Sequence, residues 1–382
     1  MSQFSKQAIW LICSVSLLFA LGLLMVFNTT AAEIMDRNLP INTHAILLKQ
    51  AAYGAVGIVL GLLVYWLGHQ KLLSWSMPLG IFCTALLFLV FIPSIGQTIN
   101  GSQRWIGFSG YTFQPSECAK IILPFCFIQW MVSGKEVVSW KGFIKIIGVL
   151  AIPMGLILME PDTGATIILF LTFVLLFILC RIPWLYWTLP LLVLCGTAAI
   201  AVSQMPHVRN RINVYLNPEL DLRGKGHQPY QAKIATGSGK LFGRGLGESL
   251  QKLNYLPEAR SDYIAAIYAE ESGFVGVCIL IALYLSLFYS GISIAIHAED
   301  RAAFLTAAML SFLIATQAFV NLGVVCGLLP SKGMTLPFFS QGGSSLIMNF
   351  IAFFLLLDIA RSNSLSKKIS PRYTQNRAAP NK

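Results

Sequence analysis

The residues best suited to bind a ligand lie in a glycine-rich stretch from Thr236 to Gly247. Lys240 and Arg244 within it, and Lys252 shortly after it, bring positive charge. Glycine lets backbone N–H groups approach a ligand closely, and such groups beside cations form a site for anions. A ligand that carries a pyrophosphate would fit this stretch. The alternative interpretation is a flexible surface loop with solvated charges.

This stretch matches neither of two common nucleotide-binding motifs. A Walker A loop needs a glycine five positions before the Gly239-Lys240 pair and a Ser or Thr after it, where this chain has Ile234 and Leu241. In a dinucleotide fingerprint the third glycine comes one residue later than it does in 243–247, and a βαβ unit surrounds the motif. The sequence therefore excludes both motifs.

Acidic residues follow the glycine-rich stretch. Glu258 and Asp262 come just before a long apolar segment, and Glu270 and Glu271 lie about two turns inside it. Ionisable residues at or below a membrane surface are costly unless they have partners or a function. We therefore treat these carboxylates as functional candidates.

A second group of candidates lies between residues 101 and 120. Pro115 and Glu117 suit the first turn of a helix, where proline is tolerated and a negative charge favours the helix dipole. Lys120 lies three residues after Glu117, so an ion pair would offset the cost of a cation in an apolar helix. Arg104 precedes Trp105, whose ring could be an interfacial anchor or part of a site.

Two further turns carry polar residues. Glu160 and Asp162 lie in a tight turn, where they could bind a divalent cation or, in the case of Asp162, cap the next helix. The second region, 327–345, is rich in glycine and proline and carries Lys332, Ser344 and Ser345. Irregular backbone at membrane depth is tolerated only where it is buried in protein or lines a polar cavity.

The elements that position these residues are predicted to be membrane helices. The chain has 382 residues, is 56% hydrophobic and only 11% charged, and its mean hydropathy is +0.69. Soluble domains have about a quarter of their residues charged. We predict an all-α polytopic membrane protein with ten apolar spans near 8–28, 46–67, 77–96, 115–133, 143–159, 163–181, 183–204, 263–295, 304–329 and 336–360.

The distribution of Lys and Arg predicts the orientation of these spans. Short loops on the side of the two termini carry most of the basic residues, which places both termini in the cytoplasm. The long loop 205–262 is then extracytoplasmic, within a transmembrane domain that covers 1–361. Residues 362–382 are predicted to form a basic, disordered cytoplasmic tail. The eight cysteines have no metal-ligand spacing, and we predict neither a metal site made from them nor a nucleic-acid partner.

Several motifs, taken in order, resemble the SEDS family (shape, elongation, division and sporulation). They are Arg104-Trp105-Ile106, Gln114-Pro-Ser-Glu117 with Lys120, Pro161-Asp162, Tyr230-Gln231, Gly237-Ser-Gly239, Leu256-Pro-Glu-Ala259 with Asp262, Glu270-Glu271, Leu328 to Pro337, and Gly342-Gly-Ser-Ser345. The resemblance covers all ten expected spans. Within the family, 251–259 and 332–335 are more similar to the division members than to the elongation members.

The resemblance implies a peptidoglycan glycosyltransferase that polymerises lipid II at the outer face of the cytoplasmic (inner) membrane, at the division septum. The family's essential carboxylate corresponds to Asp262, as general base or as ligand of a divalent cation such as Mg²⁺ or Mn²⁺. The family's cavity residues correspond to Trp105 and Glu117. The implied partners are a class B penicillin-binding protein, which is a transpeptidase, and other division proteins. An elongation-type polymerase, a lipid II transporter and a scaffold are the alternatives.

The sequence departs from the family pattern at three places. Gln341 stands where most relatives have Tyr, and Lys240 replaces the last glycine of Gly-Ser-Gly-Gly. Arg260-Ser261-Asp262-Tyr263 replaces His-Thr-Asp-Phe, which keeps the aspartate. These changes concern the geometry of the acceptor site and leave the predicted reaction class unchanged.

Overall fold

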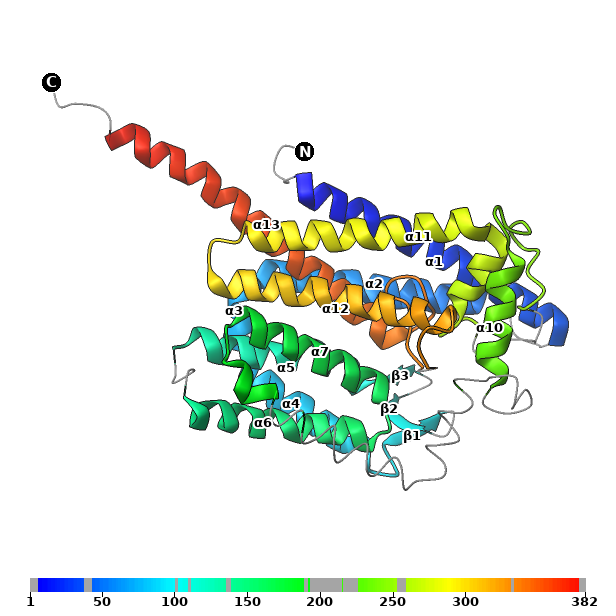
Figure 1. Ribbon diagram of the computed structural model, residues 1–382, viewed down its shortest axis with the longest axis horizontal. Helices are drawn as coiled ribbons and strands as arrows, with labels where there is room; N and C mark the ends of the chain where they lie inside the picture. Colours follow the sequence, from blue (N-terminus) through cyan, green and yellow to red (C-terminus); the bar gives the residue numbers. More distant parts are fainter. Residues whose placement is uncertain are drawn as a thin grey trace.

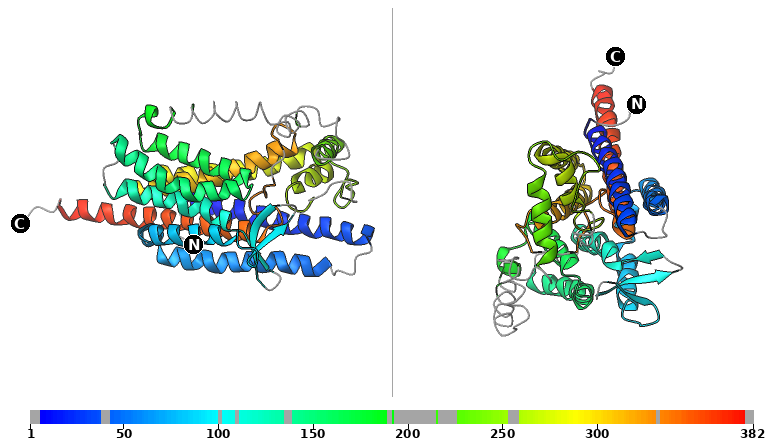
Figure 2. Two further views of the ribbon diagram at one scale, coloured as in Figure 1. Left: turned by 90° about the horizontal axis from the view of Figure 1, so that it is seen from below. Right: turned by 90° about the vertical axis from the view of Figure 1, so that its right-hand side faces the viewer.

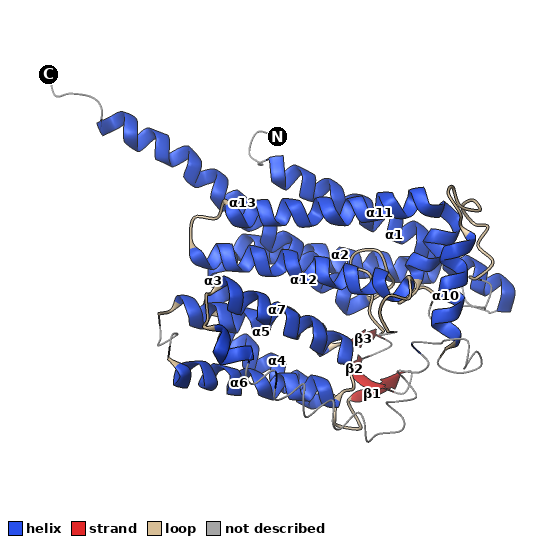
Figure 3. Cartoon of the chain, in the orientation of Figure 1, coloured by secondary structure: helices blue, strands red, loops and turns tan. Residues whose placement is uncertain are grey.

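The protein is a bundle of long helices with a small sheet at one end (Figures 1 and 3). The structure is a computed structural model that describes residues 6–37, 43–99, 102–108, 111–134, 139–188, 192, 215, 226–252, 259–330 and 333–377. The helices are α1 (Lys6–Arg37), α2 (Thr43–Leu67), α3 (His69–Ser74), α4 (Ser76–Leu89), α5 (Pro115–Val132), α6 (Trp140–Met159), α7 (Thr163–Leu179), α10 (His227–Ser238), α11 (Ile264–Ile296), α12 (Arg301–Val325) and α13 (Gly343–Arg377).

The predicted polytopic helical fold is confirmed. Within the described residues, α1, α2, α6, α11, α12 and α13 are long and apolar enough to cross a membrane, and α4 and α7 are shorter apolar helices. Their exposed surface is rich in large apolar side chains, as expected where helices face lipid. The count of ten spans stays a prediction.

The third predicted span, 77–96, was too long. Helix α4 ends at Leu89, and the chain then turns into an antiparallel sheet of β1 (Gly96–Ile99), β2 (Ser102–Phe108) and β3 (Tyr111–Phe113), in the order β1-β2-β3. A Cβ at Gly96 would collide with the carbonyl oxygen of Val90, so the turn packs tightly. The mostly apolar residues 90–95 form this turn, and hydropathy does not separate an apolar turn from a helix end.

The predicted seventh span, the long loop and the C-terminal tail are described only in part. Residues 189–191 and 193–204 of the predicted seventh span, 183–204, and all of loop residues 205–225 except 215 lie outside the described residues. The described part of the long loop contains α10, which was not predicted. The tail that we expected to be disordered from residue 362 is helical as far as Arg377, because α13 continues past its membrane span and extends away from the bundle (Figures 1 and 2).

Glycines on α2 bring α1 and α13 close to it. Added Cβ atoms at Gly54, Gly57 and Gly61 would meet aromatic rings of α1 and α13, among them those of Phe19 and Phe354. Small residues allow such close helix packing in membranes, where hydrophobic burial does not drive association. The same face of α2 carries Gln50, whose Nε2 donates to the carbonyl oxygen of Ser340 (3.1 Å). Helix α2 thereby fixes the irregular segment that precedes α13.

Candidate active site

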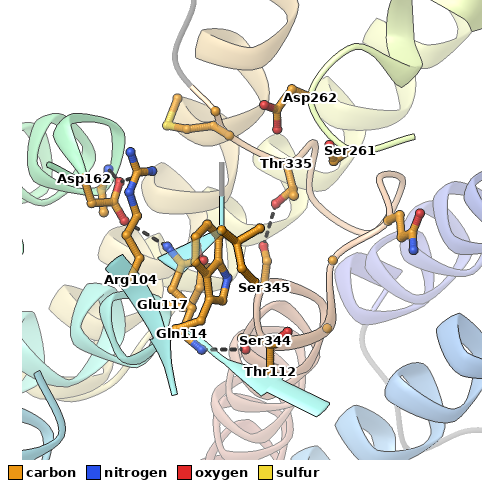
Figure 4. A pocket seen from close by; sticks show the side chains of 18 of the residues that line it. Arg104, Thr112, Gln114, Glu117, Asp162, Ser261, Asp262, Thr335, Ser344 and Ser345 are labelled. Carbon is orange, nitrogen blue, oxygen red and sulfur yellow. Dashed lines mark hydrogen bonds and ion pairs between the residues drawn. The ribbon is translucent and has the colours of Figure 1, made fainter. Parts of the chain in front are cut away.

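A cavity of about 910 Å³ opens at the end of the bundle that carries the sheet and α10, here called the cavity end. It brings together seven of the predicted site residues from four regions of the chain: Arg104, Trp105, Glu117, Lys120, Asp262, Ser344 and Ser345. Figure 4 shows Asp262 beside Ser261 and Thr335 on one side of the cavity, and Arg104 with Asp162 on another.

Strand β2 directs Arg104 toward the turn between α6 and α7. Its guanidinium donates to the carbonyl oxygens of Glu160 (3.2 Å) and Pro161 (2.9 Å) and lies 3.8 Å from the carboxylate of Asp162. Asp162 caps α7 by accepting a bond from the backbone N–H of Ala165 (3.1 Å), which confirms the predicted N-cap. Its other oxygen accepts bonds from Gln114 and Ser116 on the α5 side. Asp162 thus joins three elements and also lines the cavity.

The carboxyl group of Glu160 is fully buried beneath this turn. Among the described residues, neither of its oxygens has a hydrogen-bond partner. Burial is the main cause that raises the pKa of Glu160 to about 8; the nearby Asp162 carboxylate contributes to the rise, and the Arg104 guanidinium opposes it. An isolated carboxylate in such a place is costly, so the group takes up a proton.

Glu117 and Lys120 form the predicted ion pair. Lys120 Nζ lies 2.8 Å from Glu117 Oε1, one turn away on α5, and also donates to Oε1 of Gln317 on α12 (3.3 Å). The lysine is buried, with 4% of its surface exposed, and Pro115 occupies the first turn as expected. A buried cation with two acceptors is held in one position, here at the wall of the cavity.

Asp262 lies just before α11 and faces residues 333–336. A Cβ at Gly333 would lie 3.1 Å from Asp262 Oδ2, so only glycine leaves the carboxylate its present room. Asn321 of α12, itself buried, donates to the carbonyl oxygens of Asp262 (2.9 Å) and Met334 (2.7 Å). This amide fixes the main chain at Asp262 relative to the opposite wall of the cavity.

Gln317 and Asn321 were missed by the sequence reasoning. Gln317 donates to the carbonyl oxygen of Thr335 (3.1 Å), so the two amides, one turn apart on α12, hold the same irregular segment. A signal was available, because polar side chains inside an otherwise apolar span are rare and usually face the bundle interior.

The two serines of the Gly-Gly-Ser-Ser motif connect the elements around the cavity. Ser344 Oγ accepts a bond from the backbone N–H of Gln114 (2.9 Å), which ties α13 to the start of α5. Ser345 Oγ accepts a bond from the hydroxyl of Thr335 (2.9 Å). Glu258 and Lys332, which were also predicted, lie outside the described residues.

The basic side chains of the glycine-rich stretch do not line this cavity. Lys252 is buried, and its Nζ donates to Glu271 Oε1 (2.8 Å), Asn28 Oδ1 (2.8 Å) and the carbonyl oxygen of Gly247 (2.6 Å). Its three donors are therefore all used within the protein. The basic side chains of the glycine-rich stretch therefore lie away from the cavity, whereas the sequence had suggested that they form an anion site.

Arg244 and the glycines also have structural partners. Arg244 Nε lies 3.6 Å from the buried carboxylate of Glu270, which further accepts a bond from Ser249 Oγ (2.6 Å). Gly273, with φ of 66°, breaks α11. The stretch pairs with this break: the N–H of Arg244 donates to the carbonyl oxygen of Glu270, and the N–H of Phe274 donates to that of Lys240. Added Cβ atoms at positions 239 and 243 would collide with α11, which explains those glycines.

Lys240 itself has φ of 48°, in the left-handed region that favours glycine. This conformation gives a physical reason for the glycine that the family pattern has at this position. The lysine side chain is exposed outside the cavity.

The described residues do not fit a divalent-cation site made by protein alone. Among them, no three His, Cys, Asp or Glu side chains come together. The oxygens of Asp162 accept hydrogen bonds within the protein, and Glu117 is paired with Lys120. Mg²⁺ or Mn²⁺ stays an expectation from the resemblance, and we assign no step to it.

These features define a polytopic membrane protein with a charged cavity at one end of its helix bundle. A sequence profile described as Cell cycle protein, FtsW/RodA/SpoVE, matches residues 8–365. The chain therefore belongs to this family, which confirms the SEDS resemblance.

Named relatives match over almost the whole chain. A Legionella pneumophila protein named "Probable peptidoglycan glycosyltransferase FtsW" is 39% identical over 93% of this chain and 91% of its own length. "Stage V sporulation protein E" of Bacillus subtilis is 35% identical over 90% of this chain and 94% of its own.

Two solved structures have the same fold. One, described as "Structural coordination of polymerization and crosslinking by a peptidoglycan synthase complex", has a TM-score of 0.76 at 25% identity and covers 95% of this chain and 99% of the other. The rod shape determining protein RodA of Thermus thermophilus has a TM-score of 0.66 at 24% identity and covers 95% and 98%. The RodA likeness concerns the fold alone.

Proposed function

We propose that this protein is a peptidoglycan glycosyltransferase that polymerises lipid II during septal wall synthesis. The observation that carries the proposal is the convergence of Asp262, Glu117, Lys120 and Arg104 on one cavity of about 910 Å³. The volume is in the range of small-molecule sites, and the charged and hydroxyl-bearing lining suits a saccharide with a charged attachment. The names of the relatives support the reaction class.

Asp262 is the group that would act as general base. Its carboxylate would take the proton from the 4-hydroxyl of the acceptor sugar as that oxygen bonds to the anomeric carbon of the donor. The bond from that carbon to the lipid pyrophosphate breaks, and the pyrophosphate leaves with both electrons. Arg104 and Lys120 line the same cavity and could stabilise the developing negative charge, the role that the sequence suggested for the glycine-rich stretch.

We further propose that the protein works with a class B penicillin-binding protein at the division septum, with both termini in the cytoplasm and the cavity on the outer face. The synthase complex named above, which combines polymerisation with crosslinking, supports a transpeptidase partner. The bias of Lys and Arg toward the loops on the side of the termini supports the orientation.

A lipid II transporter predicts buried charge along a path through the bilayer. A charged cluster does exist at the opposite end of the bundle, where buried Asp358 accepts bonds from buried His69 (2.8 Å) and from Arg361 (2.8 Å), whose side chain is 37% exposed. The sequence reasoning missed this cluster. Its members pair with one another and do not line the cavity, so the cluster favours a structural role at that end.

The test is in vitro polymerisation of purified lipid II by the full chain with its cognate penicillin-binding protein. Base catalysis contributes about 10²- to 10⁴-fold, so Asp262→Ala and Asp262→Asn should lose nearly all glycan synthesis while the complex forms as in the wild type. Glycan strands from wild type and from Asp262→Asn alike would refute the role of Asp262. An intact wild-type complex that makes no strands would refute the polymerase.

A further inference from the structure

Exposed apolar side chains gather beside the break in α11. Phe242 is 77% exposed, Leu246 68% and Phe274 63%, and Leu241 and Val275 are also exposed. We call these five residues the apolar ridge. A ridge of large apolar side chains is unfavourable in water, so its surroundings need a physical account.

The level of the ridge relative to the membrane follows from the backbone. Gly273 interrupts α11, and the segment that follows it runs from Phe274 to Ile296. At 1.5 Å per residue that segment is about 34 Å long, which matches the roughly 30 Å of a bilayer's hydrocarbon core. The N–H of Val275 donates to the carbonyl oxygen of Leu241 (3.1 Å), and that of Phe274 to Lys240 (2.9 Å). The ridge therefore lies level with the first turn of the membrane-spanning segment.

The ridge is also continuous with the lipid-facing surface of α11. Ile279, Leu285 and Tyr289, farther along the same helix, are 51%, 61% and 74% exposed. No change of polarity separates this surface from the side chains of Phe274 and Val275. A lipid environment that covers the helix would thus cover the ridge as well.

Charges beside the ridge complement the phosphates of lipid headgroups. Lys240 is exposed, and the side chain of Arg244 is 38% exposed. The nearby acidic residues Glu270 and Glu271 are buried, whereas Glu248 is exposed. Cations next to exposed aromatic and aliphatic side chains are typical of segments that lie in a membrane interface.

We propose that the apolar ridge inserts into the lipid leaflet at the cavity end, with Lys240 and Arg244 at the level of the phosphates. The glycine-rich stretch is then an interfacial anchor rather than a solvated loop. Because its backbone pairs with α11 on both sides of Gly273, insertion would fix the height of the Asp262 end of α11 above the bilayer.

Fluorescence quenching in lipid nanodiscs tests the insertion. In the full chain, a fluorescent amino acid replaces Phe242. The protein is then placed in nanodiscs of phosphatidylethanolamine and phosphatidylglycerol, with or without brominated acyl chains. Replacement of Glu248, which is exposed directly after the glycine-rich stretch, is the matched control, and replacement of Leu246 is a second ridge position. We expect brominated lipid to quench positions 242 and 246 at least twofold more than position 248, and aqueous iodide to show the reverse order.

Equal quenching of positions 242 and 248 by iodide, with no effect of brominated lipid, would overturn the proposal. Shielding of position 242 that arises only when the penicillin-binding protein is added would also overturn it and assign the ridge to a protein partner. Phe242 and Leu246 make up part of an exposed surface, so these replacements leave the buried packing in place.

Discussion

Removal of the Lys252 ammonium should destabilise the fold rather than remove a substrate contact. The side chains of Lys252 and Glu271 are 5% and 0% exposed and their charged atoms lie 2.8 Å apart. Breaking a buried pair by removing one partner costs about 3–5 kcal/mol, because the other charge is left without compensation. We expect Lys252→Met to lower the free energy of unfolding by about that amount.

A second substitution separates the structural role from a catalytic one. Glu271→Gln removes the charge that Lys252 neutralises and keeps an acceptor for Asn28, whose amide contacts the same carboxylate. The double variant Lys252→Met/Glu271→Gln should therefore regain at least half of the lost stability. Unfolding is followed thermally and by denaturant in detergent, and glycan synthesis is assayed below both melting temperatures.

If Lys252→Met is as stable as the wild type but makes no glycan, the ammonium acts on the substrate. If the double variant is no more stable than the single one, the pair is not the source of the loss. Restored stability with restored synthesis would confirm that Lys252 acts by holding α1, the glycine-rich stretch and α11 together.

Three further predictions concern the cavity and the glycine-rich stretch. Glu160 is buried and its pKa is about 8 against an ordinary 4.5, so the free energy of unfolding should fall as pH rises from 4.5 to about 8, by at most about 5 kcal/mol. In Glu160→Gln the melting temperature should change little over that pH range. An equal fall of the melting temperature with pH in the wild type and in Glu160→Gln would contradict this. Asn321→Ala leaves the carbonyl oxygens of Asp262 and Met334 without their donor, which should cost about 2–4 kcal/mol. It should also lower the turnover of glycan synthesis about 10- to 100-fold with little change in KM, whereas normal turnover would exclude a positioning role. Lys240→Gly should raise the free energy of unfolding by about 1 kcal/mol, because glycine adopts the left-handed backbone conformation of this position without strain. Lys240→Ala keeps that strain, so an equal gain from Lys240→Ala would assign the effect to the loss of the lysine charge.

The amino-acid sequence determined the class of the fold and the local chemistry. Apolar segments long enough to cross a bilayer can be read from composition, because lipid excludes charged and unpaired polar groups. The Glu117–Lys120 pair was predicted because its partners lie three residues apart on one helix, and the Asp162 cap because an aspartate directly before a Thr-Gly helix start is a common N-cap. Such contacts need no knowledge of the rest of the molecule.

Tertiary structure alone decided which charged side chains line the cavity and which pair with each other away from it. Lys252 had the composition of an anion site, but its partner Glu271 lies on another element and takes up its charge, whereas Arg244 lies 3.6 Å from Glu270 and keeps a side chain that is 38% exposed. Asn321 contacts Asp262 across 59 positions of sequence, and no local pattern encodes that distance. A buried charge is governed by the nearest opposite charge in space, and chain folding sets that neighbour.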